Sequence, residues 1–194
     1  MPDAQWEHDA NSVFDALYRD YLLRDFFAKI VPGSSYVALS AYAIGRFGRL
    51  LEMSFAVSMF LAGLSWAIGF AIQEAAERLS LLSQHPARFS NSEQRYDFRQ
   101  KFSLAASRDE KTRVERYAVI KEATGNLCMA LISGSVLVAV LRWKELREHP
   151  HPSLAMAFSL LAACWFLALA SRDHMKKEYD FMARALRRQS GNQD

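Results

Sequence analysis

The chain has 194 residues, of which 51% are hydrophobic, and its formal net charge is only +3. This length holds one compact unit without a second catalytic domain. The small charge, with 24 basic residues interleaved among 21 acidic ones, argues against direct nucleic-acid binding. A mean hydropathy of −0.08 is typical of a soluble protein, but the charged residues gather in blocks between apolar runs.

The first predicted element is an amphipathic helix over residues 11–29. Apolar residues recur at helical spacing from Val13 to Ile30, and charged residues occupy the other face. This helix either lies in a membrane interface or packs on its own protein. Residues 1–11 carry three acids and no Lys or Arg, so no cleavable signal peptide is expected. Pro32 and the glycine after it are expected to break the helix.

Three later stretches contain no Asp, Glu, Lys or Arg: residues 53–73, 123–141 and 149–171. Each is long enough to cross a bilayer, which takes roughly 20 apolar residues in a helix. A weaker run over 30–45 precedes two glycines and two arginines, which favour a turn at 45–49. We therefore expect four membrane-spanning helices. The alternative has three, with the first run held at the interface.

The charged segments between the spans are also predicted to be helical. A helix is expected to restart near Asn91, and Ser107 with Glu110 has the spacing of a capping box. From Arg108 that helix should continue into the third span. The fourth span should likewise continue to Arg188. Its extension carries a 4-3-4 apolar spacing typical of a coiled-coil seam, at Met175, Tyr179, Met182 and Leu186.

The predicted fold is an all-α integral membrane bundle whose second to fourth helices extend into the cytoplasm. Its segments are an N-terminal helix (1–30), two spans (31–73), a cytoplasmic insert (74–122), two spans (123–171) and a cytoplasmic tail (172–194). In this arrangement the segments on one side hold 3, 10 and 6 Lys and Arg residues, and the two loops on the other side hold 2 and 3. The positive-inside rule therefore places both termini in the cytoplasm.

Small residues recur at every fourth position in the three strong spans. They are Gly63, Ala67 and Ala71; Asn126, Ala130 and Gly134; and Ala155, Ser159 and Ala163. Such faces let helix backbones approach closely in lipid. They either pack within one subunit or make contacts between subunits. Together with the seam on the tail they predict a homo-oligomer.

No catalytic, cofactor-binding or metal site is predicted. Cys128 and Cys164 lie in apolar runs and are expected to be buried free thiols. His149 and His151 flank a proline without the further ligands that zinc needs, so a rigid turn is expected there. The polar residues Gln73, Glu74 and Asn126 fall at span boundaries, where interfacial solvation explains them. The spans carry no central acid or base, which argues against a proton-coupled carrier.

A spacing of Arg-x6-His, as in HEPN ribonucleases, occurs at Arg78 with His85 and at Arg142 with His149. Two matches in one chain show that the pattern is unspecific. A HEPN-like ribonuclease is therefore the least favoured alternative, and we expect no enzyme.

The order of these elements resembles a family. An N-terminal helix ends in residues 24–33 (RDFFAKIVPG), two spans precede a charged insert, and two more precede a basic tail. The layout resembles the small four-span accessory membrane proteins of bacterial antiphage-defence loci, such as those of type VI-B CRISPR, RADAR and Kiwa systems. Residues 29–33 and 121–126 are the most family-like pieces. The resemblance implies a bacterial inner-membrane protein that docks a cytosolic defence complex, or an oligomeric pore that depolarises the membrane.

Overall fold

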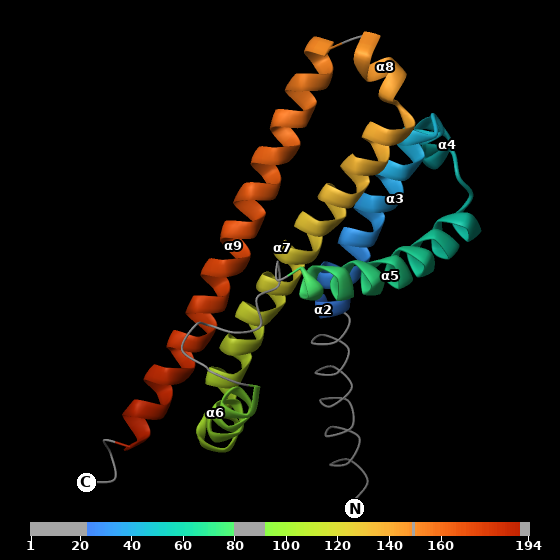
Figure 1. Ribbon diagram of the computed structural model, residues 1–194. Helices are drawn as coiled ribbons and strands as arrows, with labels where there is room; N and C mark the ends of the chain where they lie inside the picture. The colour runs from blue at the N-terminus through green and yellow to red at the C-terminus, as the bar shows by residue number, and fades with distance from the viewer. Residues whose placement is uncertain (1–22, 80–91, 149, 191–194) are drawn as a thin grey trace, which may run out of the picture.

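The computed structural model describes residues 23–79, 92–148 and 150–190, and every element within them is helical (Figure 1). The elements are α2 (Leu23–Asp25), η2 (Phe26–Ile30), α3 (Val31–Ala43), α4 (Phe47–Leu51), α5 (Phe55–Arg78), α6 (Ser92–Ala105), α7 (Arg108–Leu141), α8 (Trp143–Glu148) and α9 (Pro150–Ser190). The all-α prediction is confirmed for this part of the chain. Most of the predicted N-terminal helix and the segment that contains His85 lie outside the described residues.

Helices α7 and α9 form the long axis of the molecule and run side by side (Figure 1). The predicted capping box is present: the Glu110 backbone N–H donates to Ser107 Oγ at 3.3 Å, and the Ser107 N–H donates to Glu110 Oε2 at 3.0 Å. As predicted, α7 continues from charged into apolar sequence and α9 from apolar into charged sequence without a break, over 34 and 41 residues. At 1.5 Å per residue they are about 51 and 62 Å long.

The predicted helix break at Pro32 is wrong, and the structure shows why. Proline lacks an N–H, and its ring clashes with the carbonyl of residue i−4 in an α-helix, which here is Ala28. The chain widens into the π-helix η2, in which the Val31 N–H donates to Phe26 O. The released Ala28 carbonyl accepts a 2.6 Å hydrogen bond from Asn126 Nδ2 on α7. The helix therefore continues through Pro32 into α3.

Helix α5 crosses the foot of α3 instead of running alongside it (Figure 1). The crossing depends on two glycines. A Cβ on Gly33 would lie 2.7 Å from the carbonyl carbon of Ser65, and one on Gly69 would lie 2.7 Å from the Cα of Lys29. No side chain fits at either position, since real Cβ atoms do not approach that closely. The two backbones are therefore in direct contact.

The predicted turn after α3 begins at Gly45 and is confirmed in part. Gly45 has φ = +72°, the left-handed conformation that glycine commonly supplies after a helix end. Arg142, the residue after α7, donates from Nε to the carbonyl of Ala43 at 3.3 Å and so satisfies the last turn of α3. Residues that were expected to extend the turn form the short helix α4 instead.

Small residues lie inside and large apolar residues lie outside where the charge-free runs meet. We call residues 31–43, 55–73, 123–141 and 155–171 the apolar half. Its buried residues include Gly33, Ser65, Gly69, Cys128, Ala130 and Gly134. Its exposed side chains include Phe55, Phe60, Val140, Phe158, Trp165 and Phe166, each between 67% and 81% exposed. Within the described residues, α5 and α7 are long and apolar enough to cross a membrane.

The opposite pattern holds in residues 92–122 and 172–188, which we call the polar half. Its core contains Phe102, Ala106, Met175, Tyr179, Met182 and Ala185, all buried. The predicted seam on α9 is confirmed as a packing face, because Met175, Tyr179 and Met182 are buried and Leu186 packs beside them. Its partners are α6 and α7 of the same chain. The seam therefore no longer argues for contacts between subunits.

The three small-residue faces have different surroundings. Asn126, Ala130 and Gly134 are buried within the chain, and a Cβ on Gly134 would lie 2.5 Å from Leu39 Cδ1. In contrast, a Cβ on Gly63 would have no neighbour within 4 Å, and Ala67 and Ala71 are exposed. Ala155 and Ser159 are exposed as well. The homo-oligomer therefore stays a prediction. Only the exposed small-residue faces of α5 and α9 still support it.

Candidate functional site: a charged pocket below the apolar half

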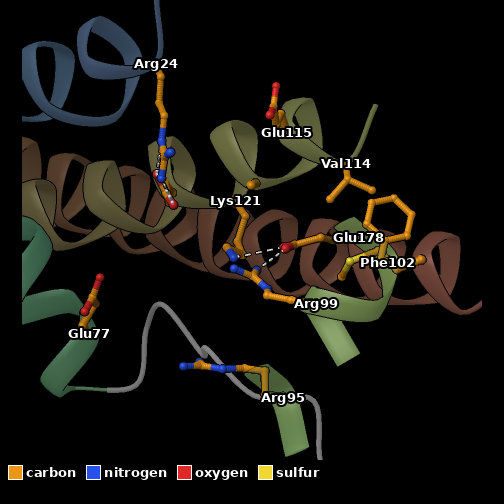
Figure 2. A pocket seen from close by; sticks show the side chains of 12 residues that line it. Arg24, Glu77, Arg95, Arg99, Phe102, Val114, Glu115, Lys121 and Glu178 are labelled. Atoms are coloured by element: carbon orange, nitrogen blue, oxygen red, sulfur yellow. Dashed lines mark hydrogen bonds and ion pairs between the residues drawn. The ribbon is translucent and has the colours of Figure 1, made fainter. Parts of the chain in front are cut away.

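A cavity of about 390 Å³ lies where five helices meet (Figure 2). It is lined by residues of α2, α5, α6, α7 and α9: Arg24, Glu77, Arg95, Arg99, Phe102, Val114, Glu115, Ala118, Lys121, Glu122, Glu178 and Met182. Four cations and four carboxylates thus face one space. Its ionic character distinguishes it from the packing of the apolar half and from the buried core of the polar half.

A buried ion triad forms one wall of the pocket. Lys121 Nζ donates to Glu178 Oε2 at 3.0 Å, and the neighbouring Arg99 guanidinium donates to Glu178 Oε1 (Figure 2). The Glu178 side chain is 1% exposed and that of Lys121 is 10% exposed. Burying a carboxylate costs several kcal/mol unless cations and hydrogen bonds compensate it. Two cations share this one carboxylate, so the wall keeps a net positive charge.

A second ion pair joins α2 to α7 at the edge of the pocket. Arg24 donates from Nε and Nη2 to both carboxylate oxygens of Glu122, at distances from 2.8 to 3.1 Å. This bidentate geometry is the strongest arrangement that an arginine offers to a carboxylate. The Arg24 side chain is nevertheless 48% exposed, so solvent weakens the pair.

Two further carboxylates, Glu77 and Glu115, line the pocket without an ion pair within the described residues. Glu77, at the end of α5, accepts only a 3.4 Å hydrogen bond from Gln73 Nε2. The Glu115 side chain, on α7, is exposed. Glu77 and Glu115 lie on opposite sides of the pocket, and Arg95 of α6 also lines it (Figure 2).

Helical spacing explains how the sequence builds this lining. On α7 the lining residues are 114, 115, 118, 121 and 122, which share one face because residues three and four apart are neighbours. On α6 residues 95, 99 and 102 follow the same rule, as do 178 and 182 on α9. Glu178 shares the buried seam with Met175, Tyr179 and Met182. A carboxylate on an apolar seam was the signal in the sequence that pointed to an internal partner.

Tyr179 lies beside the triad and links it to the core of the polar half. Its ring stacks on Phe98 at 6.2 Å between centroids, and the Arg99 guanidinium carbon is 5.7 Å from the Tyr179 ring centre. Burial raises the pKa of Tyr179 above its ordinary value, while the charge of Arg99 opposes that rise. The phenol therefore stays neutral to higher pH than a free tyrosine.

The residues singled out from the sequence lie elsewhere. Asn126 was expected to be solvated at a span boundary, and this is wrong: it is fully buried and holds the Ala28 carbonyl. Arg78 pairs with Glu74 on its own helix, and Arg142 binds Ala43 and Glu145. The histidines of both HEPN-like spacings, His85 and His149, lie outside the described residues.

The cysteines are free and buried as expected, and they face each other across α7 and α9. Cys128 Sγ lies 3.4 Å from the carbonyl oxygen of Cys164. The loop expected at residues 149–152 is shorter than predicted, because α9 already begins at Pro150. Proline is favoured in the first turn of a helix, where its missing N–H costs nothing.

The chemistry of the pocket is ionic. Its described lining holds no Ser, Thr, Cys or His, the residues that serve most often as nucleophile or as general base at neutral pH. No group of three or more His, Cys, Asp or Glu residues suited to a metal occurs in the described residues. Comparisons with protein-family models, curated proteins and solved structures found no match. The arrangement suits the binding of a charged group.

Proposed function

We propose that this chain is a four-span integral membrane protein and that its polar half docks a cytosolic protein complex at the membrane. The observation that supports the membrane placement best is the reversed packing of the apolar half. Large apolar side chains cover its outside and small residues fill its inside. Water would oppose such an arrangement, whereas lipid favours it, because helices in lipid associate through close backbone packing.

The length of the apolar half supports the same placement. On α7 the charge-free run between Glu122 and Arg142 covers residues 123–141. These 19 residues span about 28 Å, close to the hydrocarbon thickness of roughly 30 Å. Charged residues follow at both ends. At the outer end, Lys144 and Arg147 of α8 lie beyond the apolar run of α7.

The distribution of basic residues supports the orientation. Lys and Arg residues concentrate in the polar half and the tail, and few occur near α4 and α8. By the positive-inside rule the polar half and both termini are cytoplasmic. Each Lys or Arg near an anionic inner leaflet contributes on the order of 1 kcal/mol to attraction toward it.

Site-directed labelling in intact cells tests this topology. Cys128 and Cys164 are buried, so they give a low background for Glu145→Cys and Ser190→Cys variants. A membrane-impermeant maleimide should label position 145 from outside and reach position 190 only after the membrane is opened. Labelling of position 190 in intact cells would overturn the orientation.

The polar half supports docking because it has its own buried core and an exposed surface rich in Arg and Lys on α6, α7 and α9. Its pocket offers ionic groups, which supports a binding role over catalysis. The layout resembles accessory proteins of antiphage-defence loci. We therefore propose that the docked complex acts in bacterial defence at the inner membrane.

Affinity purification from membranes, with and without the neighbouring genes, tests docking. We expect a cytosolic protein to be retained at the membrane by the intact chain. A matched pair of variants locates the docking surface. Reversal of charge at Arg113 and Arg116 should release the cytosolic partner from the membrane, whereas reversal at Lys144 and Arg147 should not. If phage infection depolarises the membrane only when this chain is present, a pore replaces docking as the function.

A further inference from the structure

We infer that the charged pocket binds a phosphodiester group with a single negative charge, held by Arg95, Arg99 and Lys121. The inference rests on the proposed membrane placement for the source of this group, the headgroup of an anionic phospholipid of the inner leaflet. A soluble phosphodiester has the same chemistry and is the other source.

Three cations from two helices line one part of the pocket. Arg95 and Arg99 are four residues apart on α6, so their side chains leave the same face of that helix with Cβ atoms about 5–6 Å apart. Lys121 reaches Arg99 from α7, because both bind the carboxylate of Glu178. Figure 2 shows Arg95 on the same side of the pocket as Arg99. A phosphate placed beside them is in reach of donors from both helices.

These cations can bind an anion without losing the contacts they already make. An arginine has five N–H donors and a lysine has three, which is more than their protein partners use. The single carboxylate of Glu178 offsets only one of the two cations that bind it. The Arg99 side chain is 48% exposed, so part of its guanidinium is open to a ligand.

The carboxylates of the lining limit the charge of the ligand. Glu122 is taken up by its bidentate pair with Arg24. Glu115 is exposed and points away from the triad, whereas Glu77 lines the pocket from α5 (Figure 2). Within the described lining, four cations thus face three carboxylates, and one positive charge is in excess. A phosphodiester, with one negative charge, balances it, and a phosphate monoester would bring a second negative charge.

The depth of the pocket agrees with a lipid headgroup. Lys121 precedes the charge-free run of α7 by two residues, about 3 Å along the helix axis. Glu77 follows the charge-free run of α5 by four residues, about 6 Å. The headgroup layer extends roughly 5–8 Å beyond the hydrocarbon core on each side, so the pocket lies at the level of the lipid phosphates. Its volume of about 390 Å³ has room for a phosphoglycerol group.

Lipid retention by the full-length protein tests the site. The protein in detergent is mixed with equal amounts of phosphatidylglycerol, phosphatidylethanolamine and phosphatidylcholine and is then isolated again, and mass spectrometry counts the retained lipids. We expect phosphatidylglycerol about tenfold above the other two, because their ammonium would add a positive charge beside three cations. Equal retention of the three lipids would overturn the site.

The variant Arg95→Gln separates the pocket from the general positive charge of the surface. It should remove most of the preference for phosphatidylglycerol while the triad around Glu178 stays intact, and Arg95→Lys should keep the preference. The matched control is Arg116→Gln, which makes the same charge change at an exposed position outside the pocket. An equal loss in the control would assign the preference to the surface charge and overturn the pocket.

A second variant changes retention in the opposite direction. Glu77→Gln removes the carboxylate that lines the pocket from α5, so retention of phosphatidylglycerol should rise severalfold. Glu74→Gln is its control, since Glu74 lies one turn away on α5 and outside the pocket. Unchanged retention in Glu77→Gln would contradict the site even if Arg95→Gln proved too unstable to purify.

Calorimetric titration with glycerophosphoglycerol, the same headgroup without acyl chains, distinguishes the sources. Retention of the lipid that millimolar glycerophosphoglycerol does not displace assigns the site to a membrane lipid. Binding of the soluble compound that is lost in Arg95→Gln, without any lipid preference, keeps the site and assigns it a soluble ligand. If neither binds to a protein whose labelled positions show the proposed topology, this inference alone fails, whereas wrong labelling overturns the membrane placement.

Discussion

The polar and apolar halves share two helices, α7 and α9, yet they pack in opposite ways. In the polar half Tyr179 and Met182 are 1% exposed and charged residues cover the surface. In the apolar half Phe158 and Phe166 are each 69% exposed, while Ala130 and Gly134 lie inside. The same helix therefore changes which side chains it buries along its length. Because the backbone is continuous, the sequence itself produces this reversal: small residues occupy the packed face of one half and large apolar residues that of the other.

The largest effect is expected where two backbones touch in the apolar half. Gly33→Leu should prevent α5 from crossing α3, because the new Cβ would lie 2.7 Å from a backbone carbon of Ser65. The cost should exceed about 3 kcal/mol, the upper range for overpacked cores. Thermal unfolding in detergent measures it. Gly63→Leu is the matched control, since nothing lies within 4 Å of its Cβ.

The next effect concerns the buried ions of the polar half. Lys121→Met should destabilise the protein by about 3–5 kcal/mol, because Glu178 would lose a cation while staying buried. Lys121→Met combined with Glu178→Leu should recover most of that loss, since apolar residues of similar size replace buried pairs well. A double variant as unstable as the single one would show that the triad has another structural role. Thermal unfolding compares the three chains.

A smaller effect is expected at the start of α7, in the polar half. Ser107→Ala removes the side-chain oxygen that accepts the Glu110 N–H at 3.3 Å. Loss of such an N-cap costs about 1 kcal/mol. Hydrogen exchange at the first turn of α7 should increase, with no change in residues 123–141. An equal increase in residues 123–141 would show that the first turn of α7 and the apolar half open together.

The smallest effect is expected from pH. Because burial raises the pKa of Tyr179, the folded state holds its phenol proton more tightly than the unfolded chain. This contribution to stability is complete below the ordinary tyrosine pKa of 10.0 and is lost as pH rises above it. The polar half should therefore unfold at lower temperature above about pH 10. In Tyr179→Phe that alkaline slope should disappear, as followed by calorimetry.

Helical continuity was predictable from the sequence because it depends on local patterns. The capping box at Ser107 and the apolar spacing along α9 placed both long helices correctly. The course through Pro32 was not predictable, because it depends on Asn126, 98 residues away from Ala28. The pocket was missed for the same reason: five helices supply its lining, and spacing along one helix does not show which helices meet.

The bond between Asn126 and the Ala28 carbonyl has a consequence for how the protein is made. Proline leaves that carbonyl without its helical partner, and an unsatisfied backbone group near lipid costs several kcal/mol. Its partner lies 98 residues later in the chain. At a synthesis rate of about 5–20 residues per second, the delay is roughly 5–20 s. In the proposed membrane placement, the Ala28 carbonyl therefore gains this partner only after residue 126 has been translated.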